Sequence, residues 1–191
     1  MRKMITVKIN GEERQYPQGA TYEDVTNDYQ QEYENLIALA ARDGKIRELF
    51  KKLTRDCEVT FFTLKDDVGN KTYVRSATML FLKAVFDVYG REAAQSCRVE
   101  FAIGNGSYIS PKEKINATEE NAAKIRNRMR ELVEAKTPFL KRSYSLDNAM
   151  ELFRREGMKD KEKLFRYRRG SFVNIYEMDG YYDYYYGYML P

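Results

Sequence analysis

The stretch Ile5-Thr6-Val7-Lys8-Ile9-Asn10-Gly11, near the start of this 191-residue chain, decides how the first part of the sequence folds. Its apolar residues alternate with polar ones, which is the period of a half-buried β-strand. Asn-Gly is the strongest short signal for a two-residue hairpin turn. The sequence therefore predicts a β-hairpin whose return strand runs from Arg14 to Tyr16 and stops at Pro17.

The residues after this hairpin predict a small domain that mixes strands and one helix. Thr21 is expected to cap a helix, because its hydroxyl can accept from the first turn. Leu36–Ala41 predicts a short apolar strand, Ile46–Leu53 a short helical turn, and Val59–Leu64 a closing strand. This order is typical of a β-grasp, ubiquitin-like unit, which we expect over residues 1–65.

A second domain is expected over residues 72–191, after the polar, glycine-containing run Asp66–Lys71. Its first helix, Ser76–Tyr89, is apolar nearly all round and should be buried in a core. A β-hairpin follows, with its turn at Gly104 and Gly106. These glycines resemble a phosphate-binding loop only weakly, since no Gly-Lys-Ser/Thr follows them.

The rest of the second domain predicts helices packed on an antiparallel sheet, an α+β fold. Thr118 and Ser145 are expected to cap two helices. Three antiparallel strands are expected at Leu164–Tyr167, Phe172–Tyr176 and Tyr181–Leu190.

Composition narrows the possible chemistry. The chain has no histidine, the usual general base near neutral pH and the commonest metal ligand, and we expect no metal site. Its net charge of +4 permits an anionic partner without requiring one. Cys57 and Cys97 form no CxxC motif and are expected to be reduced thiols of a cytoplasmic protein. No apolar run reaches the length of a membrane span, so no membrane partner is expected.

Two parts of the chain resemble the N-terminal domains of threonyl-tRNA synthetases. Residues 5–64 resemble a TGS domain, a β-grasp module, through the opening strand and turn, Leu39–Leu49 and Asp56–Val59. The chain from Tyr73 onward resembles the editing domain that follows it, the "second additional domain". That likeness rests on three runs: Arg126–Val133, Thr137-Pro138-Phe139 and Ala149–Phe153.

The resemblance also implies where an editing site would lie. The family has a His-x-x-x-His pair on the apolar helix and an Asp-x-Cys group on a late strand. The matching positions here hold Arg75 and Met79 on the helix, and Asn174 and Tyr176 on the strand. Arginine is no base at neutral pH, methionine does not titrate, and tyrosine ionises only near pKa ~10. The resemblance therefore implies the fold without catalytic residues.

The same pair of domains also begins a class of bacterial uridine kinase-like proteins, in which a P-loop nucleoside kinase domain follows. The tyrosine-rich tail Asp179–Pro191 resembles that branch better than a synthetase. This likeness predicts a non-catalytic binding or regulatory region, truncated at its C-terminus. Its partner would be its own kinase domain beyond Pro191. ATP and Mg²⁺ are expected only there, and no cofactor in this chain.

Two kinds of ligand remain open for such a region. Arg75, Asn174 and Tyr176 could hold an anionic, nucleotide-like ligand in the former editing cleft, since arginine is a fixed cation. Alternatively, the chain is a tRNA- or RNA-binding module, with tyrosines available for stacking. Its contacts would come from one basic helix face, which holds Lys124, Arg126, Arg128 and Arg130.

The ordinary alternative for that helix face is a set of surface ion pairs with neighbouring glutamates, such as Glu131 and Glu134. A third hypothesis is an editing hydrolase with a rebuilt site, in which Glu177 or Asp179 would serve as the base. It is the weakest of the three, because no side chain is evidently tuned to titrate near neutral pH.

Overall fold

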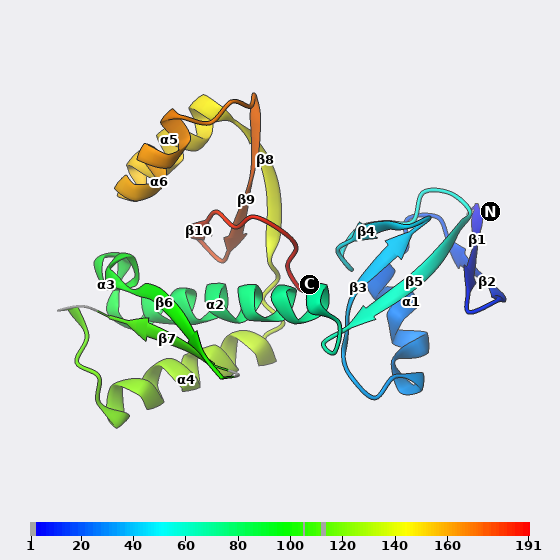
Figure 1. Ribbon diagram of the computed structural model, residues 1–191, viewed down its shortest axis with the longest axis horizontal. Helices are drawn as coiled ribbons and strands as arrows, with labels where there is room; N and C mark the ends of the chain where they lie inside the picture. Colours follow the sequence, from blue (N-terminus) through cyan, green and yellow to red (C-terminus); the bar gives the residue numbers. More distant parts are fainter. Residues whose placement is uncertain (1–2, 105, 112–113) are drawn as a thin grey trace. The chain divides into compact units, whose positions relative to one another are not determined.

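The computed structural model describes residues 3–104, 106–111 and 114–191 (Figure 1). The chain divides into two compact units. The first unit comprises the chain as far as Ser76 together with the C-terminal segment Tyr186–Pro191. The second unit is Ala77–Tyr185. The mixed α+β character expected from the sequence is confirmed.

The first unit is built on a five-stranded mixed sheet in the order β2-β1-β5-β3-β4. Strand β1 runs parallel to β5, whereas the β1–β2, β3–β4 and β3–β5 pairs are antiparallel. The helix α1 follows β2 and leads through a short 3-10 turn, η1, to β3 (Figure 1). The bounds are β1 Met4–Ile9, β2 Glu12–Pro17, α1 Tyr22–Tyr29, η1 Gln30–Glu32, β3 Ile37–Arg42, β4 Lys45–Arg47 and β5 Cys57–Thr63.

The core of this unit confirms the alternation in the opening stretch. Ile5, Val7 and Ile9 are buried, while the residues between them face outward or are half-buried. They pack with residues of α1, of which Tyr22 and Tyr29 are each 1% exposed. The predicted hairpin and the expected strands β3 and β5 are also present.

The helical turn predicted for Ile46–Leu53 is wrong. Lys45–Arg47 is the strand β4, and the chain after it is irregular. Asp43 and Gly44 both have positive φ, 50° and 75°. A two-residue turn of this kind matches the twist of an antiparallel pair and sends the chain back along β3. The sequence predicts a turn at Asp43-Gly44, which is confirmed, but the spacing of apolar side chains after it did not reveal the strand β4.

The helix α2, Asp67–Tyr89, begins much earlier than the predicted Ser76. The polar run that predicted a linker is its first turn. The glycine in this run, Gly69, is there for a packing reason and does not mark a linker. A Cβ atom at this position would lie 2.0 Å from the carbonyl oxygen of Thr63. Only glycine allows the helix to pass so close to the end of β5. The proposed limits of the domains at residues 65 and 72 stay a prediction.

The second unit holds the later part of α2, a three-stranded antiparallel sheet in the order β10-β9-β8, and a separate two-stranded hairpin, β6–β7. The hairpin confirms the predicted one, although Asn105 at its turn lies outside the described residues. The bounds are α3 Arg91–Ser96, β6 Arg98–Ile103, β7 Gly106–Ser110, α4 Glu119–Glu134, β8 Leu140–Ser145, α5 Leu146–Arg155, α6 Lys159–Arg166, β9 Phe172–Met178 and β10 Tyr181–Asp183.

Two of the three strands predicted at the end of the chain need correction. The region around Leu164–Tyr167 is not a strand, because residues as far as Arg166 form the helix α6. In a helix Phe165 is fully buried and stacks on Phe153, with ring centroids 5.2 Å apart. The predicted strand Tyr181–Leu190 shortens to Tyr181–Asp183.

The strand β8, which pairs with β9 along its whole length, was not predicted. Its residues, Leu140–Ser145, show no alternation of apolar and polar side chains. The caps Thr118 and Ser145 are confirmed, since each side chain accepts from the backbone of the first helical turn. No helix in the described part of the chain is long and apolar enough to span a membrane.

Candidate functional site

Arg75 lies in the first unit and contacts the C-terminal segment. Its Nη1 donates to the carbonyl oxygen of Tyr188 at 2.6 Å. A Cβ atom on Gly187 would lie 2.7 Å from the guanidinium carbon, so the arginine rests against the glycine backbone. Next to it, Ser76 Oγ accepts from the backbone N–H of Leu190 at 2.9 Å. The guanidinium therefore helps to hold the chain's own tail.

Met79 and Tyr176 are both fully buried, at 0% exposure. Met79 offers no titratable group, and the ring of Tyr176 lies 5.1 Å from Lys141 Nζ. Asn174 is exposed, two residues before Tyr176 on β9. The two β9 residues share a strand face, whereas Arg75 belongs to the other compact unit. The three-residue ligand pocket stays a prediction.

A buried lysine organises the charged side chains of the second unit. Lys83 on α2 is 2% exposed, and its Nζ donates to Asp87 Oδ1 at 2.7 Å. It also reaches the carbonyl oxygen of Asp179 at 2.8 Å and its Oδ2 at 3.2 Å. A buried ammonium is stable only when it is paired in this way. Asp179 is thus an ion-pair partner of Lys83.

Glu177 is also ion-paired, with Arg142 Nε at 3.1 Å. Both carboxylates suggested as a base therefore accept from a cation. Each carboxylate is thus engaged in an ion pair within the chain, and neither is placed as an unpaired proton acceptor. The rebuilt editing site gains no support from this arrangement.

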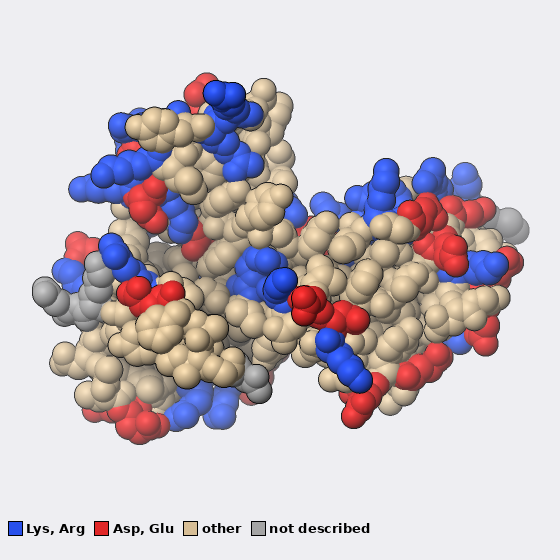
Figure 2. All heavy atoms as spheres, in the orientation of Figure 1, with Lys and Arg blue, Asp and Glu red and all other residues tan. Residues whose placement is uncertain are grey.

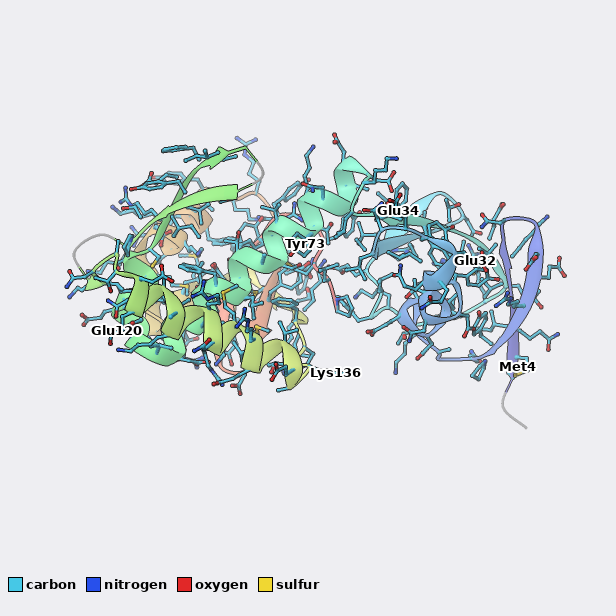
Figure 3. All side chains as sticks on the ribbon, turned by 90° about the horizontal axis from the view of Figure 1, so that it is seen from below. Met4, Glu32, Glu34, Tyr73, Glu120 and Lys136 are labelled. Carbon is cyan, nitrogen blue, oxygen red and sulfur yellow. The ribbon has the colours of Figure 1, made fainter. Side chains whose placement is uncertain are left out.

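An open groove of about 510 Å³ lies in the second unit, where α4 ends and β9 reaches its last residues. In Figure 3, the label Glu120 marks the first turn of α4, and the label Lys136 marks the chain just after the end of this helix. The former editing positions are not among the residues that line this groove. The lining residues are Arg128, Glu131, Leu132, Ala135, Lys136, Thr137, Pro138, Leu140, Glu177 and Asp179.

Most of the basic residues predicted to bind nucleic acid on α4 are ion-paired. Lys124 Nζ lies 2.7 Å from Glu120, and Arg126 lies 3.2 Å from Glu119. Hydrogen bonding to Glu120 raises the pKa of Lys124 and lowers that of the glutamate.

Arg128 is paired twice, with Asp87 at 2.9 Å and with Glu131 at 2.8 Å. Hydrogen bonds to these two carboxylates raise the pKa of Arg128. Within the described residues, only Arg130 of the four predicted cations has no carboxylate within 4.0 Å. This helix face therefore matches the alternative expectation of surface ion pairs better than that of a row of unpaired cations for RNA.

A second basic region was missed by sequence reasoning. It lies on α5, α6 and the turn that follows α6 (Figure 2). The density of lysine and arginine in residues 154–169 was visible in the sequence. Because the end of α6 was predicted as a strand, its residues were expected to alternate between two faces of a sheet.

Neither cysteine is arranged as a nucleophile. Both Cys57 and Cys97 are free thiols, as expected. Burial raises the pKa of each thiol above its ordinary value, so both stay protonated at neutral pH.

Comparison with known proteins finds threonine–tRNA ligases among the relatives of this chain. No family model matches the chain. It is 28% identical over 184 residues to the threonine–tRNA ligase of Thermotoga maritima, covering 90% of this chain and 28% of that protein. It is 26% identical over 190 residues to the same enzyme of Maricaulis maris, covering 98% of this chain and 29% of that protein. The chain thus spans less than a third of the length of the relatives it matches.

These relatives support the threonyl-tRNA-synthetase-like character expected from the sequence, over nearly the whole chain. A third match, to the threonine–tRNA ligase of Carboxydothermus hydrogenoformans, is 25% identical over 183 residues and agrees with the other two.

Proposed function

We propose that this chain is an RNA-binding module, related to a region of threonyl-tRNA synthetases, that has no editing hydrolysis. The observation that carries the proposal is the burial of Met79 and Tyr176. They stand where the family resemblance places a histidine and a cysteine. Neither side chain titrates near neutral pH, and neither is accessible to an outside substrate.

Two observations support an RNA ligand. The relatives are named as threonine–tRNA ligases, so tRNA is the natural first probe. The chain also carries a net charge of +4, and phosphate neutralisation by lysine and arginine dominates affinity for nucleic acid. The chain thus combines the charge that RNA binding needs with the loss of the groups that editing needs.

For the first unit we infer a β-grasp fold of the TGS type. Its supports are the mixed sheet, the parallel pairing of β1 with β5, and the single helix between the first hairpin and β3. For the second unit we infer a degenerate editing-domain fold, on the resemblance of its helical runs.

The proposal is tested by two measurements on the same preparation. Fluorescence anisotropy with labelled tRNA should show binding, and the logarithm of the affinity should fall linearly with the logarithm of salt concentration. Mischarged tRNA incubated with the chain should lose its amino acid only at the uncatalysed rate. Absence of binding at low salt, or deacylation above background, would contradict the proposal.

A nucleoside-kinase parent is the second candidate. The observation that favours it is the tyrosine-rich tail Asp179–Pro191, which resembles the uridine kinase-like branch. In that parent, a kinase domain that uses ATP and Mg²⁺ would follow Pro191 and be the partner of this region. Reading the gene beyond Pro191 tests the idea: a Gly-x-x-x-x-Gly-Lys-Ser/Thr motif would support it, and a stop codon would exclude it.

A further inference from the structure

The positive charge of the chain is concentrated in one short segment. Residues 154–169 contain eight basic and three acidic side chains, a net charge of +5 against +4 for the whole chain. These residues form the end of α5, all of α6 and the turn after it. Figure 2 shows lysine and arginine side chains gathered over this part of the second unit. The rest of the chain carries no net positive charge.

Three of the four cations of α6 lie on one side of the helix, and the fourth, Lys161, lies on another face and pairs with Asp183. Lys159, Lys163 and Arg166 follow one another at intervals of four and three residues, which places them on the same face. Arg169 follows in the turn.

Three of these cations are exposed and have no carboxylate within 4.0 Å among the described residues: Lys159, Lys163 and Arg169. Arg166 is the exception, because it pairs with Glu162 at 3.1 Å. This arrangement differs from α4, where most of the cations are neutralised.

Two exposed aromatic residues are close to these cations in the sequence. Tyr167 is 87% exposed at the end of α6, and Phe172 is 67% exposed at the start of β9. They flank the four-residue turn Arg168–Ser171. A large ring left in water gains none of the free energy that burial would give it. Exposed aromatic side chains next to free cations are the usual composition of a surface that binds single-stranded nucleic acid.

The turn between the two rings is held in place by contacts of Arg168 with Tyr184 and Phe165. Arg168 Nη1 donates to the hydroxyl of Tyr184 at 2.6 Å, and its guanidinium lies 5.5 Å from the ring of Phe165. Phe165 is fully buried and packs edge-on against Tyr184, at 4.9 Å between centroids. Binding would therefore need little ordering of the backbone.

We propose that α6 and the turn before β9 bind unpaired nucleotides of an RNA. The lysines and arginines would neutralise phosphates, and Tyr167 and Phe172 would stack on bases. The inference rests on the RNA-binding function proposed above and names its contact surface. Unpaired nucleotides are favoured over a duplex because stacking needs a base whose face is free. We call the residues Lys159, Lys163, Arg166, Tyr167, Arg169 and Phe172 the α6 surface.

The test compares three variants of the full chain. The first, Lys159→Gln/Lys163→Gln/Arg169→Gln, removes three charges from the α6 surface. The second, Tyr167→Ala/Phe172→Ala, removes the rings. The matched control, Lys124→Gln/Arg126→Gln/Arg130→Gln, removes three charges from α4. Circular dichroism and thermal unfolding establish that each variant is folded.

The probes are a labelled single-stranded RNA oligonucleotide and an RNA duplex with the same number of phosphates. The charge variant should weaken single-strand binding at least about tenfold and reduce the salt slope by about 2, since each lost phosphate contact is worth roughly 0.7. The ring variant should weaken it roughly tenfold with the slope unchanged, as expected for lost stacking. The control should stay within about threefold of the unmodified chain, because its cations on α4 are mostly paired already.

The outcomes distinguish a failure of the α6 surface from a failure of the proposed RNA-binding function. If the unmodified chain binds neither tRNA nor the oligonucleotide, the RNA-binding function fails and the inference falls with it. If the unmodified chain binds but the control loses as much affinity as the charge variant, RNA binding stands and the α6 surface is wrong. Equal affinity for the duplex, or an unchanged affinity of the ring variant, would likewise overturn the α6 surface.

Discussion

At the scale of single residues, Gly187 is a position where a side chain would be costly. Its φ is +128°, and a Cβ there would lie 2.7 Å from the guanidinium carbon of Arg75. Gly187→Ala should therefore lower the free energy of unfolding by about 1–3 kcal/mol, through backbone strain together with displacement of the arginine. Urea unfolding of the full chain measures the change.

The matched control for this substitution is Gly11→Ala. Gly11 has a φ of +89° in the same unit, and a Cβ added there would meet nothing within 4 Å. Gly11→Ala would introduce backbone strain without a steric contact, so it should lower the free energy of unfolding by less than Gly187→Ala. Adding Arg75→Ala to Gly187→Ala should cost less than the sum of the single changes, because the clash is already relieved. Equal losses for the two glycines would show that the contact is unimportant.

Individual residues also show how far the sequence could lead to the candidate site. Arg75, Met79, Asn174 and Tyr176 were identified because a family motif fixes their spacing. Burial was beyond the reach of the sequence, since the full enclosure of Met79 and Tyr176 depends on residues far away in the chain. Sequence reasoning likewise left open whether the α4 cations are paired, because side-chain rotamers decide that.

At the scale of elements, α1 depends on its first turn. Thr21 and Asp24 form a capping box: the Asp24 N–H donates to Thr21 Oγ1 at 3.1 Å, and the Thr21 N–H donates to Asp24 Oδ2 at 2.7 Å. Thr21→Ala should lower the free energy of unfolding by about 1 kcal/mol, because one helical N–H loses its acceptor. Chemical denaturation monitored by circular dichroism measures this loss.

Thr21→Ser is the control, since serine keeps the hydroxyl that accepts from Asp24. It should retain most of the stability of the unmodified chain. A serine variant as unstable as the alanine variant would mean that the methyl group of Thr21, rather than its hydrogen bond, is what matters.

The elements that sequence reasoning found are those with local signals, and those it missed have none. The opening hairpin and the caps Thr21, Thr118 and Ser145 act through neighbouring residues, so the sequence shows them directly. Strand β8 has no buried residue and no alternating pattern, and it is specified by its pairing with β9. The end of α6 predicts a strand because a short apolar-aromatic run fits either period.

At the scale of the whole molecule, stability should fall in alkaline solution. Burial raises the pKa of several phenols and of both thiols, which means that the folded chain holds their neutral form. The unfolded chain would ionise near their ordinary values, about 8.5 for cysteine and about 10 for tyrosine. The groups concerned are Tyr16, Tyr22, Tyr29, Tyr181, Tyr182, Tyr185, Cys57 and Cys97.

The sign follows from proton linkage. Below the unfolded pKa values both states are neutral, and this contribution to stability is fully present. As the pH rises above about 8.5 for the thiols and about 10 for the phenols, the unfolded state loses protons that the folded state keeps, so the free energy of unfolding falls. Denaturation midpoints measured across this range should decrease, and the tyrosinate absorbance should rise together with unfolding. Tyrosinate that forms fully in a folded chain would contradict the expectation.

The tail that rests on Arg75 makes the second unit an insertion within the first. Met189 is fully buried and contacts Ser76, 113 positions earlier in the chain. During synthesis, the strands of the first unit leave the ribosome long before the residue that completes its packing. Until then the site that Met189 fills stays open. A single proteolytic cut after residue 185 would likewise take a piece of the first unit away, rather than separate two whole domains.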